Sequence, residues 1–158
     1  MNEKCSSPHP FNILLVEDND DDVLLTKHAF KNVSAAVEFQ VARDGLEALK
    51  LLRHEAPYSD SVIPHIILLD LNMPRMDGRQ LLAELKQDEQ LKIIPIVILT
   101  TSAADDDVSS AYRNHASAYM TKPMDLQEFA HRTERFVGFW LSDVATLPSR
   151  LSRQQHGL

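Results

Sequence analysis

Five short apolar runs recur along the chain, and each has the length of a β-strand. They are FNILLV (11–16), VEFQVA (37–42), HIILLD (65–70), PIVILT (95–100) and SAYMT (117–121). The first, third and fourth are almost wholly apolar, as expected of strands that are covered on both faces. The second alternates apolar and polar residues, which predicts an edge strand.

Segments with a helical spacing of apolar residues lie between and after these runs. The pattern predicts helices over 21–32, 45–53, 78–87, 105–114 and from 125 to Val144. Two of them begin among clustered aspartates, which we interpret as caps and dipole partners rather than metal ligands. These are Asp20, Asp21, Asp22, Asp105, Asp106 and Asp107. Strands that alternate with helices predict an α/β fold, a doubly wound five-stranded parallel sheet.

Length and composition limit the classes of protein that this chain can be. Its 158 residues suffice for one domain, which we expect over 11–145 between a flexible N-terminal tail (1–10) and a C-terminal tail (146–158). A formal net charge of −7 argues against a general nucleic-acid binder. No apolar run is long enough to span a bilayer, and the single cysteine, Cys5, fits a reducing cytoplasm. We therefore expect a cytoplasmic protein with no nucleic-acid or membrane partner.

Charged and hydroxyl side chains follow several of the predicted strands. Ligands of open parallel sheets gather at the carboxyl ends of the strands, so these residues should meet at one edge. They are Glu17 and Asp18 after the first strand, Asp70 at the end of the third, Thr100 and Thr101 at the fourth, and Lys122 and Pro123 after the fifth. Three carboxylates, a hydroxyl and an amine are thus expected to converge.

Three neighbouring carboxylates repel one another, and a hard divalent cation is the simplest relief. Mg²⁺ prefers oxygen ligands, and it usually accompanies a phosphoryl group. We expect it to bind Asp18 and Asp70 directly, a backbone carbonyl after Asp70, and Glu17 through water. A carboxylate held by Mg²⁺ and the ammonium of Lys122 can act as a nucleophile toward phosphorus, and Thr100 could bind a phosphoryl oxygen.

Four motifs in this order resemble the receiver domain of two-component response regulators. They are VEDN (16–19), LLDLNMPRMDG (68–78), VILTT (97–101) and YMTKP (119–123). The resemblance runs from about Phe11 to about Phe139. It implies the (βα)₅ flavodoxin-like receiver fold with strand order 2-1-3-4-5.

The resemblance also implies a role for each matching residue. Asp70 matches the phosphoacceptor, Glu17 and Asp18 match the acidic pair that binds the metal, and Asn72 matches the residue whose backbone carbonyl is a metal ligand. Thr100 and Lys122 match the phosphoryl-binding groups, and Thr100 and Tyr119 match the switch pair. Asn72 and Ser102 match the residues that tune dephosphorylation, and Pro123 matches the residue after a cis peptide bond. Two features depart from the common pattern. Glu17 replaces the aspartate of many members, and APYSDSVIP (56–64) adds length. Tyr119 could also be an ordinary strand residue that never switches.

The long last helix narrows the resemblance to standalone regulators paired with bacterial phytochromes. Its second half should extend beyond the domain and leave an apolar patch exposed. We expect that patch to form the interface of a homodimer, although it could instead dock on its own sheet. The interface residues would be Phe136, Phe139, Trp140, Leu141 and Val144.

The leading hypothesis is a single-domain response regulator that is not an enzyme with external substrates. Asp70 would accept a phosphoryl group from a sensor histidine kinase, for which the resemblance suggests a bacteriophytochrome. Output would go through contacts with a target protein or through relay to a histidine phosphotransfer protein. A metal-dependent phosphatase is disfavoured, because it generally needs an aspartate at the position of Asn72. A phosphorylation-independent binding module would have no reason to keep the whole site.

Overall fold

The computed structural model describes residues 10–31, 36–73, 75–141 and 146–148. Its strands are β1 (Phe11–Val16), β2 (Val37–Ala42), β3 (Ile66–Leu69), β4 (Ile96–Thr100) and β5 (Ala118–Thr121). Its helices are α1 (Asp20–Lys31), α2 (Gly45–Leu52), α3 (Gly78–Gln87), α4 (Asp105–Arg113) and α5 (Leu126–Trp140). The strands form one parallel sheet in the order β2-β1-β3-β4-β5. The predicted fold and strand order are confirmed, and β2 lies at the edge as predicted.

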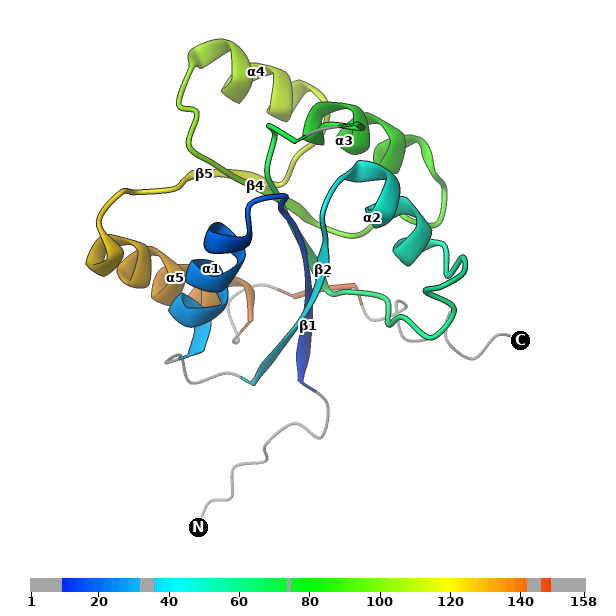
Figure 1. Cartoon of the computed structure of the whole chain (residues 1–158). Coiled ribbons are helices and arrows are strands. Elements are labelled where there is room, and N and C mark those ends of the chain that lie inside the picture. The colour runs from blue at the N-terminus through cyan, green and yellow to red at the C-terminus, as the bar shows by residue number, and fades with distance from the viewer. Residues whose placement is uncertain (1–9, 32–35, 74, 142–145, 149–158) are drawn as a thin grey trace.

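Helices cover both faces of the sheet, with α1 and α5 on one side and α2, α3 and α4 on the other (Figure 1). Alternate residues of β1 therefore enter different cores. Leu14 and Val16 pack toward α2 and α3, whereas Ile13 and Leu15 pack toward α1 and α5. All four are at most 2% exposed. Burial on both faces explains why the central strands are apolar at almost every position.

The aspartate clusters lie in the first turns of α1 and α4 rather than at their caps. Asn19 Oδ1 accepts a hydrogen bond from the N–H of Asp22, while the N-cap of α4 is Ala104, which makes no side-chain capping bond. The predicted role as dipole partners agrees with this placement, because negative charge is favourable in the first helical turn. The predicted role as caps is wrong for α4.

The last helix ends earlier than the apolar stripe predicted. Helix α5 stops at Trp140, and Leu141 already departs from helical geometry with φ −115° and ψ 15°. The side chain of Leu141 is 3% exposed in the core beneath α1 and α5. Leu141 therefore follows the end of the helix and is buried in its own domain. Val144 lies outside the described residues.

This burial corrects the predicted dimer interface. Phe136 is 5% exposed and stacks edge-to-face on Phe30, so it belongs to the same core as Leu141. Neither side chain is available to a second copy. Phe139 is 48% exposed and contacts the partly buried Trp140, so a dimer through these two residues stays a prediction.

Within the described ranges, no helix has both the length and the apolar character that crossing a bilayer requires.

A histidine joins the amino ends of β1 and β3, and its charge state should affect stability. The N–H of Asn12 donates to Nδ1 of His65 at 3.0 Å, and the N–H of His65 donates to the Asn12 carbonyl at 2.8 Å. Burial lowers the pKa of His65 from its ordinary value of 6.5. The unfolded chain therefore binds more protons near that pH, so this contribution is complete above pH 6.5 and is lost as the pH falls below it.

We predict that His65→Asn weakens the dependence of stability on pH. Urea unfolding at pH 7.5 and 5.5 measures the difference in the free energy of unfolding. The ring is only half-buried, so we expect a fraction of the one-proton limit of about 1.4 kcal/mol per pH unit. His131, whose side chain is 76% exposed, supplies the control His131→Asn, which should keep the wild-type dependence. Equal behaviour of the two variants would contradict the assignment.

Candidate functional site

The parallel register brings the predicted site residues to one edge of the sheet. Val16 pairs with Leu69, so Glu17 and Asp70 follow at adjacent strand ends. The N–H of Asp70 donates to the Val16 carbonyl at 3.1 Å, and that of Lys122 donates to the Thr100 carbonyl at 2.8 Å. These bonds continue the two ladders beyond the strands and fix where the side chains begin.

The ammonium of Lys122 lies among three carboxylates. Its Nζ is 2.5 Å from Glu17 Oε1, 3.1 Å from Asp22 Oδ2 and 3.8 Å from Asp70 Oδ2, and the side chain is 8% exposed. Burial disfavours the ammonium, but the hydrogen bond to Glu17 and the charges of Asp70 and Glu17 outweigh it and raise the pKa of Lys122. Lys122 is thus a fixed cation beside Asp70.

Glu17 is the most deeply buried of the acidic groups at this edge. It is 1% exposed, and burial together with the charge of Asp70 raises its pKa to about 7, against the opposing bond from Lys122. The N–H of Asn19 also donates to Glu17 Oε2 at 3.2 Å. A single ammonium therefore does not neutralise the acidic groups here, so further positive charge would be favourable.

The donor set fits a divalent cation. One ligand oxygen each of Glu17, Asp18 and Asp70 lies within 4.8 Å of the others. Asp18 is exposed, Asp70 is 8% exposed and Glu17 is buried, so the group extends from solvent into the sheet edge. Carboxylates with room for retained waters are the arrangement that Mg²⁺ uses. The N–H of Asn72 donates to Asp70 Oδ1 at 3.3 Å, while its role as a carbonyl ligand stays a prediction.

A buried hydroxyl without a partner lies at the end of β4. Thr100 is 0% exposed, and within the described residues its Oγ1 makes no hydrogen bond. An unpaired buried hydroxyl is unfavourable by about 1–3 kcal/mol and calls for an explanation. Thr100 ends the strand beside the one that carries Asp70, and its role as a phosphoryl-binding group stays a prediction.

Tyr119 and Ser102 are joined at the same edge. The Tyr119 hydroxyl donates to the Ser102 carbonyl at 2.9 Å, and the ring is half-buried against the core formed with α2, α3 and α4. This bond ties β5 to the loop after Thr100. The switching role of Tyr119 and the tuning role of Ser102 stay predictions.

The prediction of a cis peptide bond before Pro123 is wrong for this structure. The cis bond among the described residues is Ala56–Pro57, and the Lys122–Pro123 bond is trans. Trans is the favoured isomer of an X–Pro bond by roughly 0.5–1 kcal/mol. Lys122 reaches its carboxylate partners from the trans form.

The residues that hold the loop after Asp70 were not among the predicted site residues. Asp44 is 4% exposed, caps α2 by accepting from the Glu47 N–H, and pairs with Arg75 of the loop. The N–H of Gly45 donates to the Met76 carbonyl at 2.9 Å. An aspartate three residues before a glutamate is a signature of a helix start, so Asp44 could have been recognised as a cap, but its bond to the loop has no sequence signal.

Comparison with known proteins identifies the class. The model of the response regulator receiver domain matches residues 13–134. Response regulator Rcp1 of Synechocystis sp. is 43% identical over 137 residues, which cover 87% of this chain and 92% of that relative. The chain therefore belongs to the receiver-domain response regulators, and its acidic edge is consistent with a phosphoacceptor site.

Solved structures with similar folds include regulators named for phytochromes. The crystal structure of the phosphorylated cyanobacterial phytochrome response regulator RcpA matches with a TM-score of 0.83 at 42% identity, over 89% of this chain and 100% of that one. The Mn²⁺-bound form of Rcp1 matches with a TM-score of 0.81 at 42% identity, with the same coverage of both chains. This chain is thus similar to phytochrome response regulators.

Helix α3 packs directly on the peptide that carries Asp70, and we predict that Gly78→Ala disturbs the site. An added Cβ at Gly78 would lie 2.2 Å from the Asp70 carbonyl oxygen and 2.7 Å from the Leu71 Cα. Both atoms are backbone, so the loop must shift. Forced repacking of this kind lowers the free energy of unfolding by about 1–3 kcal/mol, measured by urea denaturation.

Gly138 in α5 is the matched control. A Cβ there meets nothing within 4 Å, so Gly138→Ala should stabilise the helix by up to about 1 kcal/mol. Wild-type stability of Gly78→Ala would show that α3 does not constrain the Asp70 loop.

We predict that Asp18→Asn weakens Mg²⁺ binding by about tenfold, because it removes one charged oxygen ligand from the cluster. Titration calorimetry measures the affinity. Asp21→Asn provides the control, since Asp21 is an exposed aspartate of the same segment that lies outside the acidic group. Equal losses in the two variants would indicate a general charge effect rather than a metal ligand.

Proposed function

We propose that this response regulator accepts a phosphoryl group on Asp70 from a partner histidine kinase in the presence of Mg²⁺. The observation that carries the proposal is the meeting, at one sheet edge, of Asp70 with a buried ammonium and with a strand that ends in an unpaired buried hydroxyl. Two relatives add support, because RcpA is described as phosphorylated and Rcp1 as Mn²⁺-bound.

The chemistry follows from the positions of the side chains. A carboxylate oxygen of Asp70 attacks phosphorus, the bond between phosphorus and the donor nitrogen breaks, and the electron pair leaves with the imidazole. Lys122 offsets charge on the phosphoryl oxygens, and Thr100 Oγ1 donates a hydrogen bond to one of them. Bound Mg²⁺ would add positive charge at the same oxygens. The product is an aspartyl phosphate.

We expect no turnover of external substrates. Water removes the phosphoryl group from Asp70, and the residues proposed to tune that step are Asn72 and Ser102. Asn72 cannot act as the acid and base that an aspartyl phosphatase generally uses at its position. Asp70 therefore serves as an acceptor whose phosphorylation state carries the signal.

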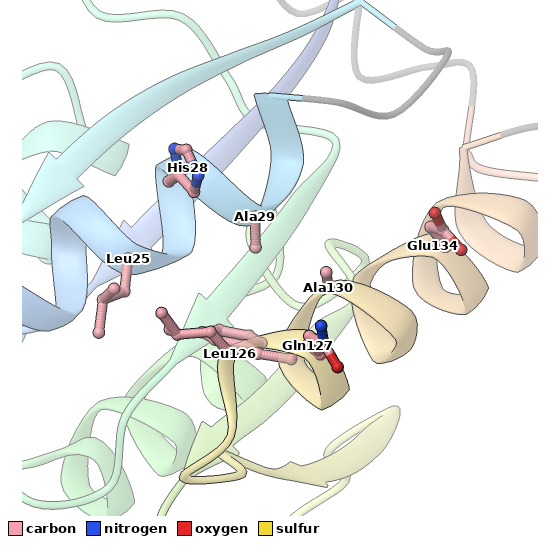
Figure 2. Close-up of a pocket in the computed structure, with 8 residues that line it drawn as sticks. Leu25, His28, Ala29, Leu126, Gln127, Ala130 and Glu134 are labelled. Atoms are coloured by element: carbon pink, nitrogen blue, oxygen red, sulfur yellow. The ribbon is translucent and has the colours of Figure 1, made fainter.

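A protein donor is favoured by an apolar pocket beside the site. A pocket of about 210 Å³ lies between α1 and α5, and Figure 2 shows Leu25 and Ala29 of α1 directed toward Leu126 and Ala130 of α5. Both helices begin at the edge that holds the acidic group, so a protein bound across their first turns could reach Asp70. The solved relatives include phytochrome and bacteriophytochrome response regulators, so we propose a bacteriophytochrome kinase as the donor.

We propose that the signal leaves this chain through contacts with other proteins. We expect phosphorylation to alter contacts with a target protein or to pass the group to a histidine phosphotransfer protein. A homodimer through Phe139 and Trp140 is the other proposed partner. The proposed protein targets are supported by the family, and the proposed homodimer is supported by the exposed Phe139 ring.

The direct test is intact mass spectrometry after incubation with acetyl phosphate and Mg²⁺. We expect a single phosphoryl adduct that is absent from Asp70→Asn and absent when the metal is chelated. Asp77→Asn is the control, because Asp77 lies in the same loop but caps α3. Labelling of Asp70→Asn at the wild-type yield would refute the site. Absence of any adduct in the wild-type chain would favour a binding module that does not use phosphorylation.

A further inference from the structure

A chain of polar contacts joins α3, α4 and the loop that follows Thr100. Arg79 of α3 donates to Asp107 Oδ1 at 2.8 Å, and the hydroxyl of Ser102 donates to Asp107 Oδ2 at 2.6 Å. Asp107 thus holds one group with each of its two oxygens. The motif roles of the site residues do not account for Arg79 or Asp107.

The contacts of Arg79 extend to the phosphoacceptor loop. Its other terminal nitrogen lies 3.5 Å from the carbonyl of Leu71, the residue after Asp70. Hydrogen bonding to Asp107 raises the pKa of Arg79, and hydrogen bonding to Ser102, followed by that to Arg79, lowers the pKa of Asp107. Both side chains are therefore charged, and charge-assisted hydrogen bonds are stronger than neutral ones.

Ser102 occupies the position where this chain of contacts meets the site. It is two residues after Thr100, its hydroxyl is held by Asp107, and its carbonyl accepts the bond from Tyr119. Its hydroxyl oxygen also accepts the N–H of Ala104 at 3.3 Å. The loop from 101 to 104 is thus held at both Ser102 and the start of α4. Any movement of Thr100 toward a group on Asp70 would therefore require this loop to move as well.

We propose that Arg79 and Asp107 are positioning residues that hold Ser102, and therefore the loop after β4, in the arrangement seen here. By holding this loop they oppose the binding of a phosphoryl group by Thr100. The inference rests on the proposed function of Asp70. Loss of either side chain lowers the free energy needed to move the loop. The fraction of molecules that present the Thr100 hydroxyl then rises, and with it the rate of phosphorylation.

The experiment compares initial rates of Mg²⁺-dependent labelling by acetyl phosphate, followed by intact mass on the full chain. We expect Arg79→Ala and Asp107→Asn to be labelled roughly two- to fivefold faster than the wild type, the size expected for one partly exposed charged contact. Arg79→Lys should lie between them and the wild type, since lysine keeps the charge but not the two-pronged reach. Circular dichroism and urea unfolding check that each variant is folded.

Arg53→Ala is the matched control. Arg53 of the α2 C-terminus pairs with Glu84 and Asp88 at the other end of α3, and its side chain is 37% exposed against 39% for Arg79. Its removal should leave the labelling rate unchanged. The labelling rate of the double variant Arg79→Ala with Ser102→Ala distinguishes a positioning role from a merely structural one. Two residues of one connected group should give non-additive effects, so the double variant should be no faster than the faster single variant.

The possible results separate this inference from the proposed function. Faster labelling of the variants with non-additive coupling supports the positioning role. Labelling of Arg79→Ala and Asp107→Asn at or below the wild-type rate, or additive effects in the double variant, overturns it while the phosphoacceptor assignment stands. A wild-type chain that takes no label at all overturns the phosphoacceptor assignment and, with it, this inference.

Discussion

The carboxyl edge of the sheet buries more negative than positive charge, and the loops around it are arranged to hold this imbalance in place. One ammonium, that of Lys122, faces Glu17, Asp22 and Asp70, and burial leaves Glu17 with a pKa of about 7. Buried charges that are only partly paired reduce stability, and relief comes from a further cation or from neutralisation. The same imbalance that disfavours this edge energetically makes it suitable for binding a metal ion and for phosphoryl chemistry.

Such a site functions only if its loops keep the charges in place. Two unlike devices do this for the loop after Asp70. Gly78 lets α3 approach the Asp70 carbonyl closely, and the buried Asp44 at the start of α2 pairs with Arg75. At the end of β4, Asp107 holds Ser102, so the loop after Thr100 is fixed by a contact between two partly exposed groups. We expect the first loop to be the rigid one and the second to be the one that moves.

Local patterns in the sequence predicted most of the fold and the site, because the rules involved are local. Apolar runs gave the strands, and parallel topology placed residues such as Asp70 and Lys122 at one edge. Contacts set by packing were not predictable in this way. Helical spacing cannot tell whether Leu141 turns back into its own core, and one aspartate of a cluster, Asp107, bonds across two elements for reasons visible only in three dimensions. The isomer at Pro123 likewise depends on its surroundings.

A crystal structure of the chain with Mg²⁺ and beryllium fluoride, a mimic of the phosphoryl group, would test the assignment of Asp70 as the phosphoacceptor. We expect the fluoride complex on the Asp70 carboxylate, with Thr100 Oγ1 and Lys122 Nζ each within hydrogen-bonding distance of a fluorine. The metal should be held by Asp18 and Asp70. The assignment would be contradicted if, at saturating ligand, the Asp70 carboxylate carried no complex, Thr100 Oγ1 were still unpaired and Lys122 were still bonded to Glu17.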